Sequence, residues 1–163
     1  RITGLNARDT GLVLLLQPVL MALLSPVTGA LSDRINPAVL ASSGMILITF
    51  GLSCLAINVS LSSFWLIALA LVIIGIGFAL FTAPNNNAIM GSVAPKYYGA
   101  ASSVVSTVRL IGQVLSVAII TLILSQSGAA ATSTWLAQHI QQAFIVFTVL
   151  CAIGIIPSAA RSK

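Results

Sequence analysis

Long apolar blocks alternate with short polar connections along this chain. Each block is long enough to cross a hydrocarbon core of about 30 Å as an α-helix, which needs about 20 residues. The blocks lack the alternation of apolar and polar residues that a membrane β-barrel requires. The pattern therefore predicts an all-α membrane protein with about five transmembrane helices, over residues 11–31, 38–57, 64–83, 101–124 and 140–156.

Prolines and small polar residues mark the predicted helix ends. Asn36 can cap the second helix, with Pro37 in its first turn, where a missing N–H costs nothing. Pro84 and the three asparagines that follow it are expected to close or break the third helix, and Pro157 to end the fifth. Residues 125–133 are small and polar, which is typical of a surface loop.

Composition supports the membrane interpretation and excludes several functional classes. Of the 163 residues, 58% are hydrophobic and 6% are charged, whereas about a quarter of a soluble domain is charged. The net charge of +5 comes from scattered residues, so no basic run indicates nucleic-acid binding. The two cysteines lie inside apolar blocks, as packing residues do. We find no nucleophile–base pair, metal cluster or phosphate-binding loop, so we expect neither an enzyme nor a cofactor.

The basic residues of the connections predict an orientation. One side of the predicted bundle carries Arg34, Lys96, Arg161 and Lys163. The two loops on the other side carry no Lys or Arg, although two arginines precede the first span. Because basic loops remain in the cytoplasm, we expect the loops near Arg34 and Lys96 and the C-terminus to be cytoplasmic, in a plasma or inner membrane.

Arg109 is the most informative residue of the chain. It lies about nine residues, or ~14 Å, into the fourth predicted helix, where an arginine costs ~2.5 kcal/mol unless it faces protein or water. Its neighbours at helical spacing form a polar stripe: Ser102, Ser106, Gln113 and Ser116. The stripe favours a substrate pathway or gate lined by Arg109 and Gln113. The alternative is that Arg109 extends to the cytoplasmic interface or pairs with a carbonyl group at a helix end.

The first predicted helix contains Pro18 and Pro26 inside an apolar run. Each proline removes a backbone hydrogen bond, which membranes tolerate where protein or a water-lined cavity satisfies the freed groups. One face of this helix is more polar than the rest, with Gln17, Met21, Ser25, Thr28 and Ser32. We predict a kinked helix that lines a cavity, with Gln17 on the substrate pathway; a kink that serves packing alone is the alternative.

Small residues at a spacing of four predict close helix contacts. Gly75 and Ala79 form one such pair, and Gly112 and Ser116 form another. This spacing lets helix backbones approach each other without large side chains between them.

Acidic residues are scarce in the predicted spans. The two in the chain, Asp9 and Asp33, lie at helix ends, and His139 lies at the start of the fifth helix near the outer surface. Proton relays in membranes use carboxylates or histidines inside the bilayer. If transport is coupled to protons, we expect the coupling group to lie outside this chain.

Four motifs resemble those of a known family. The segment GALSDR, with Gly29, Asp33 and Arg34, resembles the G-x-x-x-D-R loop signature of the major facilitator superfamily. The segments PNNNAIMGSVAP at 84–95, GAAS at 99–102 and TVRLIGQ at 107–113 resemble its fourteen-span drug:proton antiporter branch. The order of these pieces is that of the branch, and the resemblance covers nearly the whole chain.

The resemblance implies a fold and a function. The chain would be the C-terminal part of a transporter, with helices eight to twelve of a twelve-helix core, and its partner would be the missing N-terminal half. The first, third and fourth helices would border the central cavity, and the second and fifth would lie outside. Asp33 and Arg34 would lock and release the two halves in alternating access. The implied activity is proton-coupled export of drug-like, amphipathic or cationic small molecules across the lipid bilayer.

The chain departs from the family pattern at two places. Residues 36–38 replace the basic end of the loop signature, which weakens a charge lock, and Ser116 stands where the pattern often has glycine. Two other functions stay open from the sequence: a metabolite transporter of the same superfamily, and a membrane scaffold that does not transport. The substrate is not determined by the sequence.

Overall fold

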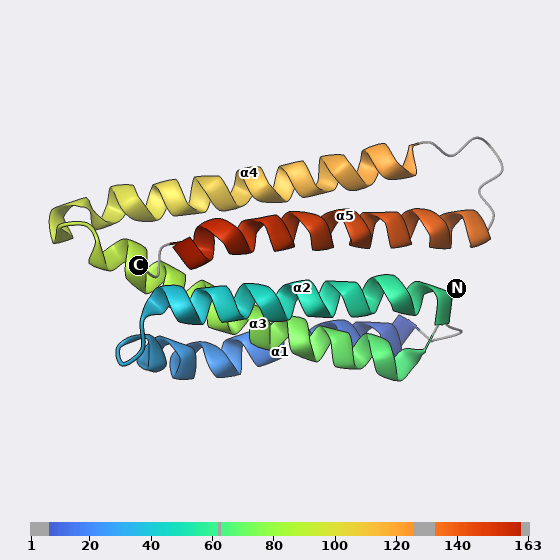
Figure 1. Ribbon diagram of the computed structural model, residues 1–163, viewed down its shortest axis with the longest axis horizontal. Coiled ribbons are helices and arrows are strands. Elements are labelled where there is room, and N and C mark those ends of the chain that lie inside the picture. The colour runs from blue at the N-terminus through green and yellow to red at the C-terminus, as the bar shows by residue number, and fades with distance from the viewer. Residues whose placement is uncertain (1–6, 62, 126–132, 161–163) are drawn as a thin grey trace.

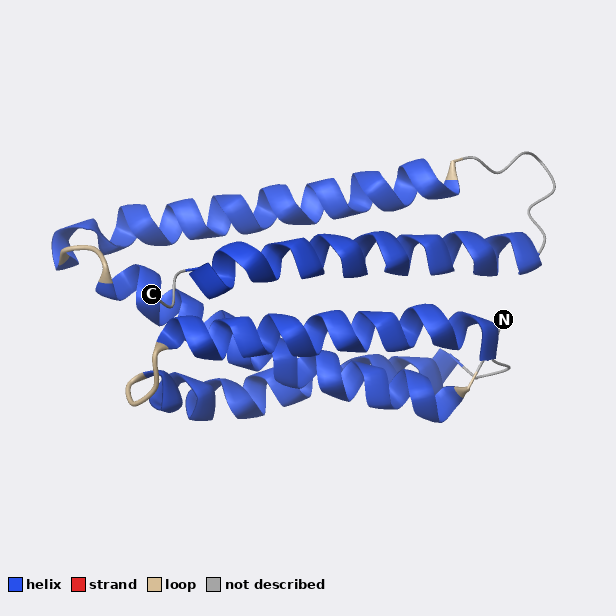
Figure 2. Cartoon of the chain, in the orientation of Figure 1, coloured by secondary structure: helices blue, strands red, loops and turns tan. Residues whose placement is uncertain are grey.

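The computed structural model describes residues 7–61, 63–125 and 133–160, and in these ranges the chain is helical with short connections (Figure 2). The helices are α1 (Ala7–Ser32), α2 (Pro37–Leu61), α3 (Phe64–Gly91), a 3-10 turn (Pro95–Tyr97), α4 (Tyr98–Leu124) and α5 (Ser133–Ala160). Each of the five α-helices is long and apolar enough to cross a membrane, with a mean hydropathy between 1.9 and 2.8. The predicted fold class, part of a helical membrane bundle, is confirmed.

The α3 helix holds the bundle together. It packs extensively against α1 and α2, while α5 packs against the other side of α2 (Figure 1). The buried apolar side chains belong to these first three helices: Val13, Leu40, Ala41, Ile48, Ala56, Ala70, Leu71, Ile74 and Ala79. In contrast, α4 touches α3 and α5 only lightly, and no residue of this fully described helix is buried. One face of α4 is therefore available to line a cavity.

Glycines allow α2 and α3 to approach each other closely. A β-carbon at Gly44 would lie 2.6 Å from the carbonyl oxygen of Gly77, and one at Gly77 would lie 2.8 Å from that of Gly44. No side chain fits in that space without backbone movement. The contact is of the small-residue type that drives helix association in lipid, where the hydrophobic effect between helices is absent.

Hydrogen bonds connect α1 to α3 along the polar face of α1. The Thr28 hydroxyl donates to the carbonyl oxygen of Ala79 at 2.9 Å, and the Asn87 amide donates to the Ser32 hydroxyl at 2.8 Å. Thr28 and Ser32 are both buried. The polar face predicted for the first helix therefore packs against α3 in its C-terminal half.

Several helix ends differ from those predicted. Asn36 caps α2 as expected, since its side-chain oxygen accepts from the N–H of Ala38 at 2.9 Å. Pro84 and Pro157 do not end their helices, because α3 continues to Gly91 and α5 to Ala160. Proline removes one hydrogen bond but does not stop a helix whose neighbours satisfy or enclose the freed group, and Pro84 is fully buried.

The start of α5 also differs from the prediction. The helix begins at Ser133, before the predicted apolar span, and most of the predicted loop (residues 126–132) lies outside the described residues. His139, which was expected at the exposed start of the helix, lies in its second turn and is partly buried. Its ring stacks on Trp135 at 3.8 Å, and its Nδ1 lies 2.9 Å from the Trp135 carbonyl oxygen.

Candidate substrate cavity between α1, α3 and α4

A cavity of about 460 Å³ lies between α1, α3 and α4. It brings together the three residues predicted to line a substrate pathway: Gln17 from α1, and Arg109 and Gln113 from α4. Polar residues make up much of the rest of its wall: Thr82, Asn85, Asn86 and Ser116. Gln17, Arg109 and Gln113 lie inside apolar helices, where a polar side chain needs protein, water or a ligand as a partner, so the cavity is the candidate functional site.

The backbone of α1 next to the cavity is positioned by contact with α3. Gln17, which is partly buried, packs with its main chain against Gly75, where a β-carbon would lie 3.0 Å from the Gln17 carbonyl oxygen. The next residue in the sequence is Pro18, which α1 contains without interruption. Close contact with α3 thus brings the Gln17 side chain to the cavity.

The helical repeat of α4 places Arg109, Gln113 and Ser116 on one face, at spacings of four and three residues. Arg109 lies eleven residues beyond the start of α4 at Tyr98, or ~16 Å along the helix axis. The Ser116 hydroxyl donates to the carbonyl oxygen of Gln113 at 2.8 Å. The serine is therefore satisfied by its own helix, and the charge of Arg109 dominates this face.

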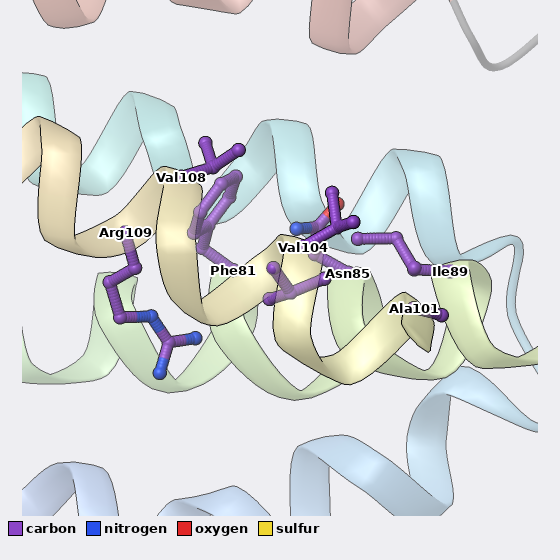
Figure 3. Close-up of a pocket in the computed structure, with 8 residues that line it drawn as sticks. Phe81, Asn85, Ile89, Ala101, Val104, Val108 and Arg109 are labelled. Atoms are coloured by element: carbon purple, nitrogen blue, oxygen red, sulfur yellow. The ribbon is translucent and has the colours of Figure 1, made fainter. Parts of the chain in front are cut away.

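A second cavity, of about 550 Å³, lies between α3 and α4. Its wall is largely apolar, with Ile89 and Phe81 from α3 and a row of residues from α4: Ala101, Val104, Val105 and Val108. Figure 3 shows Arg109 at the opposite end of the labelled set from Ile89 and Ala101. Phe81, Asn85 and Arg109 line both cavities, so the apolar and the polar space adjoin at these three residues.

Asn85 and Asn86 line the cavity but were not predicted as site residues from the sequence. They were expected to form a helix end, whereas α3 continues through them and turns them to the cavity. Phe78 and Thr82 lie seven and three residues before Asn85, so all three share a helix face. If the predicted helix had been extended past Pro84, this pattern would have predicted Asn85 and Asn86 as site residues.

The loop-motif residues lie at the C-terminal end of α1, outside both cavities. Asp33 and Arg34 follow the last residue of α1 and are exposed, and Gly29 is partly buried with open space around it. Asn87 of α3 hydrogen-bonds to Ser32, the residue before Asp33. The motif is thereby connected to the helix that carries Asn85 and Asn86.

The predicted packing residues have different surroundings. Gly75 is buried against α1. Gly112 has no heavy atom within 4 Å of the position that its β-carbon would take, and both Gly112 and Ser116 face the cavity. A packing role for Gly112 and Ser116 stays a prediction.

Arg109 is the one ionisable side chain among the described residues that line the two cavities. The two acidic residues of the sequence, Asp9 and Asp33, lie near the start of α1 and just after its end. A lone cation at this depth needs water, protein or a ligand to compensate the loss of hydration.

A bundle of membrane-spanning helices around a polar cavity at mid-helix depth is the architecture of an integral membrane transporter. The family comparison agrees with this assignment: residues 1–161 match the Major Facilitator Superfamily. The chain belongs to this superfamily, whose members are transporters rather than enzymes.

Individual relatives include transporters with different stated roles. The chain is 28% identical to the uncharacterized transporter YebQ of Escherichia coli strain K12, over 99% of the chain and 35% of the relative. It is 28% identical to the riboflavin transporter RibZ of Clostridioides difficile strain 630, over 96% of the chain and 35% of the relative. It is 29% identical to the lincomycin resistance protein LmrB of Listeria innocua, over 95% of the chain and 35% of the relative.

The chain thus spans about a third of the length of the curated relatives that it matches. No solved structure gives a significant match.

Proposed function

We propose that this chain is the C-terminal part of an exporter of drug-like or amphipathic small molecules, of the fourteen-span drug:proton antiporter branch. The observation that carries the proposal is the meeting of Gln17, Arg109 and Gln113 at one cavity between three membrane-spanning helices. A scaffold without transport activity has no use for a charged side chain at this depth, which costs ~2.5 kcal/mol or more in lipid. The similarity to LmrB, a lincomycin resistance protein, supports export of drugs in particular.

Transport proceeds by alternating access, in which two helical halves rock around a site near the bilayer midplane. The N-terminal half completes the cavity from the open side of α4. Asp33 and Arg34, exposed at the end of α1, contact that half in one of the two states. Their exposure and the hydrogen bond between Ser32 and Asn87 support a role in transmitting movement to α3.

Protons are the proposed coupling ion. The chain's two acidic side chains are near the ends of α1, so the carboxylate that carries the proton belongs to a part of the transporter outside this chain. The protein resides in the plasma or inner membrane, with the connections near Arg34 and Lys96 and the C-terminus in the cytoplasm.

A second candidate is a metabolite transporter of the same superfamily, which the similarity to the riboflavin transporter RibZ favours. The two candidates differ in substrate and not in the cavity used. Efflux of a panel of antibiotics and uptake of vitamins, measured with the whole protein in a strain without competing transporters, distinguishes them.

The test of the proposal is the Arg109→Ala variant of the whole protein. Export is expected to fall to the level of cells without the transporter, while membrane insertion stays normal. Val114→Ala is the matched control, because Val114 is on α4, 68% exposed, and lines neither cavity. Export by Arg109→Ala at the wild-type rate, at equal abundance in the membrane, would remove Arg109 from the mechanism.

A further inference from the structure

The two adjoining cavities differ in chemistry. The cavity between α3 and α4 is lined mainly by apolar side chains, among them three valines and Phe81, and its volume of about 550 Å³ is in the range of sites for drug-sized ligands. The other carries amides from three helices, among them Gln17, Asn86 and Gln113. A ligand that fills both needs an apolar body joined to a polar head, and the junction lies at Phe81 and Arg109.

The polar cavity offers more hydrogen-bond donors than acceptors. Each Gln or Asn amide is balanced, with two donor hydrogens and an oxygen that can accept two hydrogen bonds. The excess comes from the Arg109 guanidinium, which supplies five donor hydrogens and no acceptor. The ligand head that satisfies this wall is rich in acceptor oxygens. A carboxylate fits the guanidinium fork particularly well, since both are planar and form two parallel bonds.

The charge of the cavity walls also favours a ligand with an anionic head. Arg109 is the one ionisable side chain on the described walls, and no acidic residue is present on them to bind a cation. A positive ligand is therefore repelled by the charge of Arg109 in this half of the site, and a negative one is attracted.

We infer that this site selects amphipathic molecules with an anionic or acceptor-rich head, which binds at Arg109 and Gln113, over cations with the same apolar body. The inference rests on the proposed function and narrows its class of substrates. It disfavours the cationic substrates that the family resemblance allowed. The apolar body lies along Val105 and Phe81, and the head lies between α1 and α4.

Two fluorescent probes with one apolar body test the selectivity: pyrenebutyrate, which is an anion, and pyrenebutyltrimethylammonium, which is a cation. The whole protein is expressed in a bacterial strain without competing exporters, and loss of cell-associated pyrene fluorescence is followed. We expect the anion to leave at least about tenfold faster than the cation, relative to cells without the transporter. The Arg109→Gln variant should lose this preference, and Arg109→Lys should keep part of it.

A second pair of variants tests the apolar cavity. Val105→Phe fills space between α3 and α4 and is expected to weaken binding of both probes by a similar factor. Val114→Phe adds the same bulk on the opposite side of α4, nine residues away, and is expected to change neither. Binding is measured as pyrene anisotropy with the purified protein, so the result does not depend on transport.

The outcomes separate the inference from the function on which it rests. Export of the cation as fast as the anion, with no change in Arg109→Gln, overturns the selectivity and leaves export standing. Binding of the anion through Arg109 without export of either probe supports the selectivity and overturns the exporter. Absence of both binding and export at normal membrane abundance overturns both.

Discussion

Gly75 of α3 lies against the backbone of Gln17 of α1, with 3.0 Å between the Gln17 carbonyl oxygen and the position of a Gly75 β-carbon. The same imagined β-carbon would lie 3.2 Å from the β-carbon of Leu20. Gly75, which has no side chain, thus holds in place a residue that lines the candidate cavity. Packing of α1 against α3 at this contact therefore determines where the Gln17 side chain lies in the cavity.

Substitution of this glycine is expected to displace α1. Gly75→Val places a branched side chain where even a β-carbon is tight, and overpacking of this kind costs about 1–3 kcal/mol. We expect a lower free energy of unfolding in a detergent titration of the whole protein, together with reduced export. The matched control is Gly11→Val, since Gly11 has no heavy atom within 4 Å of its β-carbon position. Equal stability of the two variants would refute the close contact.

The hydrogen bond from Thr28 to Ala79 is expected to stabilise the pair α1 and α3 modestly. Thr28→Val keeps the shape of the side chain and removes the donor, and such bonds in membrane bundles contribute ~0.6 kcal/mol on average. The unfolding free energy should fall by about this amount. Thr107→Val, which removes a hydroxyl bonded only within its own exposed helix, is the comparison. A larger loss in Thr107→Val than in Thr28→Val would contradict the assignment.

Orientation can be tested at the two ends of α4. Ser92 precedes this helix and Ser125 follows it, and both are exposed. In a background with alanine at the two native cysteines, a membrane-impermeant maleimide should label Ser125→Cys in intact cells and Ser92→Cys only after permeabilisation. The physical reason is retention of basic loops in the cytoplasm. Labelling of Ser92→Cys from outside would reverse the proposed topology.

The arrangement of helices follows from the sequence to a large extent. Apolar block length predicts five spans because the bilayer sets the length of a helix that crosses it. Asn36 and Pro37 predict the start of α2 correctly, since capping is a local effect of adjacent residues. The predicted end of the third helix at Pro84 was wrong, because burial of a proline among neighbouring helices is a tertiary effect.

The site was predictable in part, for a similar reason. The stripe on α4 and the polar face of α1 are local patterns, so Arg109, Gln113 and Gln17 could be named from the sequence. Their meeting at one cavity depends on how α3 sits between the two helices, which no local pattern contains. The close approach of Gly44 to Gly77 was not predicted, because the two residues belong to different helices and the spacing of small residues was compared only within one helix.

Occupation of the cavity between α1, α3 and α4 by substrate can be tested by protection of Gln113 from labelling. In the whole protein with alanine at Cys54 and Cys151, Gln113→Cys is reacted with N-ethylmaleimide with and without the pyrene probe that cells export faster. We expect slower labelling of Gln113→Cys with the probe present, and no change at Val114→Cys, which lines neither cavity. Equal labelling rates at Gln113→Cys with and without the probe, while the probe is still exported, would contradict binding of the substrate in this cavity.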